Sequence, residues 1–591
     1  MRSPTSDVSQ TSTTGIVSSR PKLNFARVSS LDRLLAYHEE LAAYDKYSAS
    51  TAQAVELSSD VHIRVNNGTE AEHGHFQTAS STNKRFRSLI VEVGFCFTIA
   101  MTQLLSELYI SGFALVLVDL VKDAPGMGSP STGSFWPAAV LSLVISATLL
   151  IWARISDMHG GYLPLMFGLL WLTIWSIMPA IFLSLVVLNI ARAMQGLAIA
   201  ALMPSVFVLL GHAYDDSRRK NIVLGIYGAC APLGFYAGFV VAGLLPPEHS
   251  SLFFLVAGVL SFLTMVTAFL SVPHDTTDRH EMHLKMDWLG AFCIISGLIL
   301  IDYALAAEPR QAELQQTTTA FQAPLILCPL LAGIITLGVA VWVEGWHASC
   351  PLLPFDFFRP EGLKSFCLAC VFLYGSFGVW LYTTSEYFSL PMVTEQSRPV
   401  EGMQLVLWYT PLLVFGITFS LVGGAVAKWL SLKVLICVAG IAYIGASLVF
   451  ATAPVPLHFW LMVLPSMVCA SLGTDLTFTI SNIFLTVSQP RKYQGMAGAV
   501  SSILFNLGVS FALPISEIAF AYGRTSPQLT QRVADDAEVS AYRRAFLCAT
   551  ASATAGLLIC VFCFPSSLRS PVTTVKGQTS SASSVSEVEQ A

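Results

Sequence analysis

Charge is scarce in this sequence. Asp, Glu, Lys and Arg make up 12% of its 591 residues, about half the share found in a soluble domain. No basic segment interleaved with aromatic residues indicates binding to nucleic acid. The 12 cysteines are scattered, most of them inside apolar segments, so they form no disulfide framework. These absences exclude an ordinary soluble domain, a nucleic-acid-binding protein and a small disulfide-stabilised domain.

Apolar residues, in contrast, make up 54% of the chain and occur in blocks of 20 or more. A helix of about 20 residues crosses a hydrocarbon core of about 30 Å. Lipid offers the backbone no hydrogen-bond partner, so each block forms a helix or belongs to a closed barrel. Blocks such as 254–272 lack the polar and apolar alternation of a barrel strand. The sequence therefore predicts an all-α integral membrane protein with about fourteen transmembrane helices, at 88–118, 135–153, 163–183, 186–210, 221–245, 251–272, 287–307, 323–344, 365–388, 403–427, 433–453, 459–488, 495–521 and 543–565.

The two ends of the chain lack such blocks. Residues 1–87 and 566–591 are rich in Ser and Thr, and we expect two disordered tails. The first also lacks the short apolar core of a cleavable signal peptide. If the N-terminus is inside, the inner loops and flanks hold 17 Lys and Arg residues and the outer ones hold 7. This excess predicts that both termini are cytosolic.

A polar segment, 274–285, divides the predicted helices into groups. We expect an N-terminal six-helix bundle at 88–272, an inner loop with two inserted helices at 273–364, and a C-terminal six-helix bundle at 365–565. Two bundles that face each other across a central cavity are the arrangement of alternating-access carriers.

The fourth predicted helix contains a charge. Arg192 is the seventh residue of the span 186–210 and would cost at least about 2.5–3.5 kcal/mol in lipid unless it faced a polar interior. Gln195 lies on the same face, and Gly196 lets another helix approach closely. These residues resemble the R-x-x-Q-G pattern in the fourth helix of the drug:proton antiporters of the major facilitator superfamily. The alternative is an arginine that only pairs with a neighbour to fix the packing.

Two further segments of the first half are similar to motifs of that superfamily. After the second helix, Asp157 and Gly160 match the loop pattern G-x-x-x-D-R-x-G-R-R/K, which implies a gate loop, although Asp before Gly is also an ordinary turn. In the fifth helix, Gly228, Pro232 and Gly234 resemble a degenerate G-x-x-x-G-P-x-x-G-G motif. Such residues permit close helix packing and a kink, and packing without any antiport role is the alternative.

The second half carries a more specific resemblance. The segments 472–478 and 494–498, with Asn506, Glu517 and the D-W-x-G sequence at 287–290, are similar to a fungal fourteen-span branch, the aminotriazole-resistance-like carriers, which includes drug, borate and ammonium transporters. The resemblance covers residues 88–565. It implies the major facilitator fold of two six-helix bundles plus two inserted helices, a monomer without a cofactor or metal, and the proton gradient as driving force.

Two acidic residues lie deepest in the predicted helices, Glu107 and Asp475. A buried carboxyl group can exchange a proton near neutral pH, and no histidine lies well inside a span. We therefore take Glu107, Arg192, Gln195, Asp475 and Glu517 as candidates for proton coupling or the substrate path. Counting from the outer face places Glu107 about 15 Å deep and Arg192 about 10 Å deep, which predicts that they pair. For Asp475, a purely structural hydrogen-bonding role is the alternative.

Three functions are compatible with these observations. The favoured one is a proton antiporter in the membrane of a fungal-type cell, which exports a small amphipathic drug or secondary metabolite by alternating access. Uptake or facilitated transport of a small nutrient or ion, such as ammonium or borate, is the second. A membrane sensor or enzyme is the third, and the sequence contains no convincing catalytic cluster. The expected partners are the substrate and the lipid of the cell membrane or of a vacuolar or other internal membrane.

Overall fold

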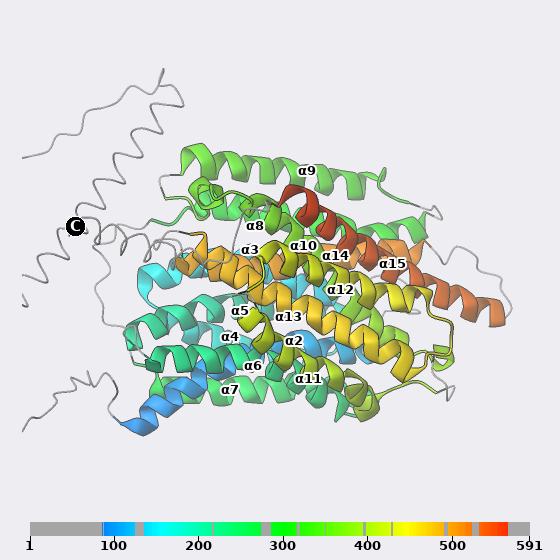
Figure 1. Cartoon of the computed structure of the whole chain (residues 1–591), viewed down its shortest axis with the longest axis horizontal. Coiled ribbons are helices and arrows are strands. Elements are labelled where there is room, and N and C mark those ends of the chain that lie inside the picture. The colour runs from blue at the N-terminus through cyan, green and yellow to red at the C-terminus, as the bar shows by residue number, and fades with distance from the viewer. Residues whose placement is uncertain are drawn as a thin grey trace, which may run out of the picture. The chain divides into compact units, whose positions relative to one another are not determined.

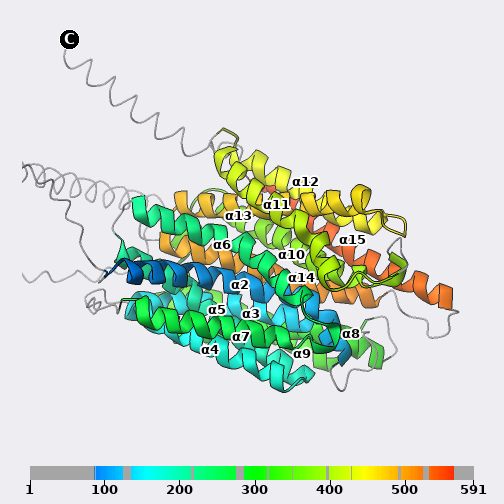
Figure 2. The ribbon, with the colours of Figure 1, turned by 90° about the horizontal axis from the view of Figure 1, so that it is seen from below.

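The computed structural model describes residues 86, 88–123, 135–214, 218–273, 285–315, 319–348, 350–393, 398–426, 429–489, 494–522 and 531–564. The two predicted tails, apart from residue 86 near the edge of the first, and most of the inner loop after the sixth helix lie outside these ranges. All described residues belong to one compact unit. The fold is formed by fourteen long helices that lie side by side (Figures 1 and 2).

The first six long helices are α2 (Leu89–Asp123), α3 (Trp136–His159), α4 (Tyr162–Ile181), α5 (Leu185–Ala213), α6 (Arg218–Gly243) and α7 (Leu252–Ser271). The inserted pair is α8 (Trp288–Leu314) and α9 (Pro324–Trp342), which continues into one π-helical turn, η3 (Val343–His347). The last six are α10 (Leu363–Phe388), α11 (Gly402–Val426), α12 (Leu432–Thr452), α13 (Leu464–Val487), α14 (Gln494–Ala521) and α15 (Gln531–Cys563). Short turns η1 (Pro247–His249), η4 (Phe355–Phe358), η5 (Pro391–Val393) and η6 (Phe459–Val463) connect them.

All fourteen helices are long and apolar enough to cross a membrane, which confirms the predicted fold class. The predicted ends of the helices are less accurate than their number. α2 and α8 each continue for several residues past the predicted end, and α15 begins at Gln531 rather than at residue 543. Arg543 therefore lies inside α15, where its Nη2 donates a hydrogen bond to the carbonyl of Ala453 at 2.7 Å. Hydropathy detects only the part of a helix that crosses lipid, whereas backbone hydrogen bonding continues into water.

The two groups of six helices pair internally in the same way. In the first group α2 packs on α6 and α7, α3 on α5, and α4 on α5 and α7. In the last group the helices at the same positions pair identically: α10 with α14 and α15, α11 with α13, and α12 with α13 and α15. Such an internal repeat is typical of secondary transporters.

Contacts between the two groups follow the same symmetry. The second helix of each group packs on the fifth helix of the other, so that α3 contacts α14 and α6 contacts α11. Within each group, a glycine allows the fifth helix to touch the first. A Cβ atom on Gly234 of α6 would lie 2.5 Å from the carbonyl oxygen of Leu104 in α2. A Cβ atom on Gly508 of α14 would lie 2.4 Å from the carbonyl oxygen of Val371 in α10. Close backbone contacts of this kind require glycine.

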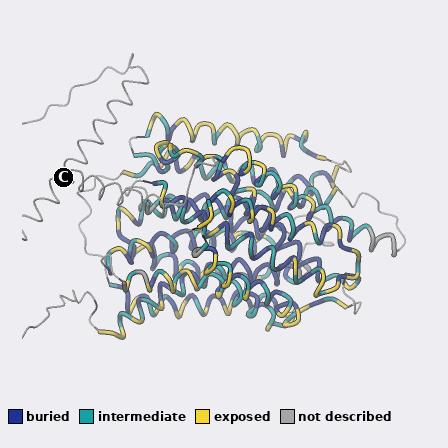
Figure 3. Tube along the Cα trace, in the orientation of Figure 1, coloured by how far each residue is buried: buried dark blue, intermediate teal, exposed yellow. Residues whose placement is uncertain are grey.

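The inserted pair lies beside the interface between the two groups. α8 packs on α9, and it also contacts α3 of the first group and α14 of the last. α9 is exposed along most of its length (Figure 3), and its buried residues are Ile326, Gly333 and Ala340. α9 therefore forms an outer helix that is held mainly by α8.

Candidate functional site

Arg192 is fully buried inside the first group of helices. Its Nη1 donates to the carbonyl of Tyr109 at 3.0 Å and to Oε1 of Gln195 at 3.2 Å, and its Nε donates to the carbonyl of Pro137 at 3.3 Å. The guanidinium also lies over the ring of Phe113, 3.9 Å from the centroid. The side chain thus joins α2, α3 and α5 without a carboxylate partner among the described residues.

Gln195 and Gly196 support this arrangement from α5. Gln195 is fully buried and donates from Nε2 to the carbonyl of Trp175 in α4 at 3.2 Å. A Cβ atom on Gly196 would lie 2.6 Å from the carbonyl oxygen of Leu141 in α3. The R-x-x-Q-G pattern therefore fixes four helices of one bundle at close range.

Glu107 does not pair with Arg192, and the predicted ion pair is wrong in this structure. Glu107 Oε1 accepts a hydrogen bond from Gln103 Nε2 at 3.0 Å, one turn earlier on α2. Tyr109, whose carbonyl binds Arg192, lies two residues further along the same helix, and two residues rotate a helix by about 200°. Glu107 therefore projects from one side of α2, and Arg192 contacts the opposite side.

Asp475 is held in the middle of α13 by two hydroxyl groups. Ser471 donates to Oδ2 at 2.9 Å from one turn earlier, and Ser420 of α11 donates to Oδ1 at 3.1 Å. Gly416 of α11 lies opposite, and a Cβ atom there would approach Oδ2 to 3.2 Å. Ser471, Ser420 and the glycine thus fix the carboxyl group next to α11.

Glu107 and Asp475 come from different bundles and are close enough for their charges to interact. Tyr227 of α6 is also within electrostatic reach of Glu107. Both residues keep part of their surface accessible although they lie at mid-helix, so they border a space between the bundles. Within the described part of the chain, no basic side chain pairs with either acid. The arrangement can bind protons, a cation or a hydrogen-bond donor.

At one end of this space, α6 and α11 are in tight contact. Tyr236 Oη lies 3.0 Å from Thr410 Oγ1, and the rings of Phe239 and Tyr409 are 4.5 Å apart between centroids. A Cβ atom on Gly243 would lie 3.0 Å from the carbonyl oxygen of Gly402. The cavity at this end measures about 30 Å³, which is room for little more than one water molecule. No larger solute can pass here in this conformation.

The opposite half of α6 is open. We predicted that Gly228 lets helices approach closely, but no atom lies within 4 Å of the position its Cβ would occupy. The same holds for Gly225, one turn earlier. Pro232 lies inside α6 between this open half and the packed half around Gly234. Gly228 therefore does not have the predicted packing role in this conformation, because no atom of a neighbouring helix lies next to it.

Gly160 ends α3 with a backbone torsion φ of +88°, a conformation that favours glycine. Its N–H donates to the carbonyl of Ser156 at 2.9 Å. Asp157 lies in the last turn of α3 and is exposed. Arg154, one turn earlier, donates to the carbonyl of Pro351 at 2.6 Å. The segment predicted to form a gate loop thus holds the chain between η3 and η4 against α3.

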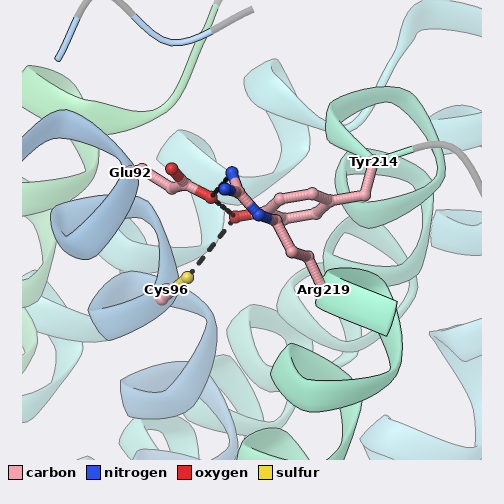
Figure 4. A network of polar contacts seen from close by, with 4 residues as sticks. All are labelled: Glu92, Cys96, Tyr214 and Arg219. Carbon is pink, nitrogen blue, oxygen red and sulfur yellow. Dashed lines mark hydrogen bonds and ion pairs between the residues drawn. The ribbon is translucent and has the colours of Figure 1, made fainter. Parts of the chain in front are cut away.

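A second polar network ties the start of α2 to the end of α5 and the start of α6 (Figure 4). Glu92 Oε1 accepts from Tyr214 Oη at 3.1 Å and from Arg219 Nη1 at 3.4 Å, and Cys96 Sγ lies 3.6 Å from Tyr214 Oη. Burial, with the neighbouring Cys96 thiol and Glu92 carboxyl group, raises the pKa of Tyr214 above its usual range. Tyr214 therefore stays a neutral hydrogen-bond donor.

The remaining acidic candidate, Glu517, lies near the end of α14 and is buried. The structure does not bring it to the hydroxyl groups that hold Asp475. Sequence reasoning missed the three side chains that bind the two central acids. Gln103 and Ser471 each stand four residues before the acid they bind, a spacing that could have revealed them, whereas Ser420 is on another helix and left no such signal.

Two six-helix bundles related by an internal repeat, with polar and acidic groups between them, define a secondary transporter. Residues 95–513 match the model of the Major Facilitator Superfamily. The chain belongs to this superfamily, and it is a transporter rather than an enzyme.

Several fungal transporters are similar to this chain. The chain is 27% identical to Efflux pump terJ of Aspergillus terreus over 76% of this chain and 86% of the pump. It is 29% identical to the Aminotriazole resistance protein of Saccharomyces cerevisiae over 71% and 75% of the two chains, and 26% identical to the Low affinity ammonium transporter of that yeast over 73% and 82%. These matches confirm the predicted fungal, drug-efflux-like branch.

Solved structures share the fold. The nucleoside transporter NupG has a TM-score of 0.52 at 12% identity and covers 79% of this chain and 98% of its own. A POT peptide transporter in complex with sulfate has a TM-score of 0.53 at 14% identity, over 79% and 94% of the two chains. At this level of identity the likeness concerns the fold alone.

Proposed function

We propose that the protein exports a small molecule from the cytosol in exchange for protons, and that Glu107 and Asp475 are the groups at which proton and substrate alternate. The observation that carries this proposal is the placement of two acids, one from each bundle, at mid-helix and within electrostatic reach of each other, with no basic partner among the described residues. Two carboxylates so placed repel each other unless a proton or another positive group lies between them.

The exchange follows from this repulsion. With protons bound, the two bundles can approach around the site. A substrate that brings positive charge or hydrogen-bond donors replaces those protons and satisfies the carboxylates instead. The facing acids therefore favour a cationic or donor-rich amphipathic molecule. The inner excess of Lys and Arg predicts that α2 begins in the cytosol, so the contact between α6 and α11 would close the outer side, and the described conformation would face the cytosol.

Substitution of each acid tests the proposal. The purified protein would be reconstituted in vesicles with an imposed pH gradient, and 3-amino-1,2,4-triazole, methylammonium and a set of fluorescent amphipathic cations would be followed. We expect Glu107→Gln and Asp475→Asn each to abolish gradient-driven accumulation. Asp356→Asn, which removes an exposed acid paired with Arg359 at 3.2 Å, should leave it unchanged. Full gradient-driven transport in both acid variants would refute the proposal.

Uptake of a small cation is the second candidate function. The same pair of acids would attract ammonium or a methylated amine, and a relative is named as an ammonium transporter. The two functions differ in the direction of coupling. In the vesicles, a proton-coupled exporter moves its substrate in the direction opposite to proton flow and accumulates it. A facilitator only lets methylammonium equilibrate, and the imposed pH gradient drives no accumulation other than that set by the membrane potential.

A further inference from the structure

The inserted pair contains a buried acid that the central site does not use. Asp302 is the fifteenth of the 27 residues of α8 and is fully buried. Within the described ranges, neither of its carboxylate oxygens has a hydrogen-bond partner. The hydroxyl group of Ser510 in α14 interacts with it, but the contact does not meet hydrogen-bond geometry.

The other two buried acids of the pair are in a different situation. Glu308 of α8 accepts a hydrogen bond from the backbone N–H of Ala320 at 2.8 Å, and Glu344 of η3 accepts one from the N–H of Leu353 at 3.2 Å. Both therefore fix a connecting segment. Asp302 binds no such segment, so a structural role of this kind does not account for it.

No ionisable side chain faces Asp302 from the helices that pack on α8. α9 carries Cys328 alone, and α14 carries Glu517 alone. α3 carries Arg154, Asp157 and His159 only in its last two turns. η3, which also contacts α8, carries Glu344 and His347. None of these interacts with Asp302. An ionised carboxylate with neither a counter-charge nor a hydrogen-bond donor is too costly to keep inside a bundle, so in this conformation the group is neutral.

α8 cannot keep this environment unchanged during transport. It contacts α3 of one bundle and α14 of the other, and alternating access moves the two bundles against each other. At least one of the two contacts must shift in each cycle. A shift at α14 would separate Asp302 from Ser510 and admit water to the carboxyl group.

We propose that Asp302 is a second proton-binding site, at the contact of the inserted pair with α14, which holds a proton while α8 is seated as seen here and releases it when the bundles move. The proposal rests on the alternation between two conformations in the proposed function, but it does not require that Glu107 or Asp475 carry protons. It gives α8 and α9 a role in sensing which conformation the transporter adopts.

Infrared spectroscopy of the full chain in lipid nanodiscs tests the assignment without any substrate. A protonated carboxyl group without a hydrogen bond gives a separate C=O absorption. We expect this band in the wild type near neutral pH and its loss in Asp302→Asn. Ser510→Ala should shift the frequency of this band. This second variant tests the assignment if Asp302→Asn fails to fold. Glu308→Gln, on the same helix, should leave the band in place. A wild type without the band, or a band insensitive to both Asp302→Asn and Ser510→Ala, would overturn the proposal.

A disulfide tests the link to conformation. A Cβ atom on Gly243 of α6 would lie 2.3 Å from Cγ2 of Val406 in α11, so Gly243→Cys with Val406→Cys places two thiols within bonding range and locks the closed end when oxidised. We expect the Asp302 band to persist to a pH about one unit or more higher in the oxidised than in the reduced variant. The wild type under the same oxidation is the control. Identical titration of the oxidised and reduced variant would show that the proton is independent of conformation and would refute the inference, whatever Glu107 and Asp475 do.

Discussion

Two glycines of α6 provide a matched test of how the helices pack. Gly234 and Gly228 lie six residues apart on one helix, but their surroundings differ. A Cβ atom on Gly234 would lie 2.5 Å from the carbonyl oxygen and 2.7 Å from the Cα atom of Leu104, whereas one on Gly228 would meet no atom within 4 Å. We predict that the same substitution, glycine to alanine, has opposite effects on stability at these two sites.

The magnitudes follow from two terms. Alanine in a helix interior is favoured over glycine by about 0.5–1 kcal/mol, and this gain applies equally to both positions. At Gly234 the added methyl group meets backbone atoms that cannot rotate away, so α6 and α2 must separate, at a cost of about 1–3 kcal/mol. The helix term cancels between the variants. The free energies of unfolding should therefore differ by about 1–3 kcal/mol, with Gly228→Ala the more stable.

The measurement is unfolding of both variants and the wild type in the same detergent, followed by tryptophan fluorescence during a titration with denaturing detergent. Gly234→Ala should unfold at a lower denaturant fraction than the wild type, and Gly228→Ala at the same or a higher one. Equal midpoints for the two variants, or the reverse order, would show that α6 does not pack on α2 as described.

Three other predictions concern the topology and the polar contacts. Epitope tags at either end of the chain should be protected from antibody in intact spheroplasts, because the inner loops carry more Lys and Arg, and labelling from outside would reverse the topology. Tyr214→Phe should lower the free energy of unfolding by about 1 kcal/mol through loss of its bond to Glu92, whereas Arg219→Gln, at an exposed ion pair, should change it by less than about 0.5 kcal/mol. Arg192→Lys should destabilise the protein by about 2–5 kcal/mol, because one ammonium cannot reach the carbonyls of both Tyr109 and Pro137, and a variant as stable as the wild type would contradict this account.

The fold could be predicted from the sequence because lipid imposes a simple rule on it. A backbone that crosses the membrane must be helical, so apolar length alone located the fourteen helices. The ends were less predictable for the same reason. Asp123 at the end of α2 and Arg532 near the start of α15 lie in helical turns whose composition is polar, and hydropathy carries no information about helices in water.

The candidate site was predicted in part. Depth along a helix is readable from the sequence, and it points to Glu107 and Asp475, which lie within electrostatic reach of each other in the structure. Which groups bind them is readable only where the partner is one turn away on the same helix, as Gln103 and Ser471 are. Ser420 comes from another helix, and its position depends on how α11 packs on α13. The buried environment of Asp302 likewise depends on where the inserted pair is seated.

The incorrect pairing of Glu107 with Arg192 shows why depth alone does not define a site. The two residues lie at similar depths, but rotation about the axis of α2 places them on opposite sides of that helix. Arg192 binds backbone carbonyls and the ring of Phe113 inside one bundle, and relative motion of the bundles leaves these contacts intact. Glu107, in contrast, faces Asp475 of the other bundle. Under the proposed function, a proton on Glu107 changes the repulsion between the bundles rather than the packing within one, and alternating access requires a change between the bundles.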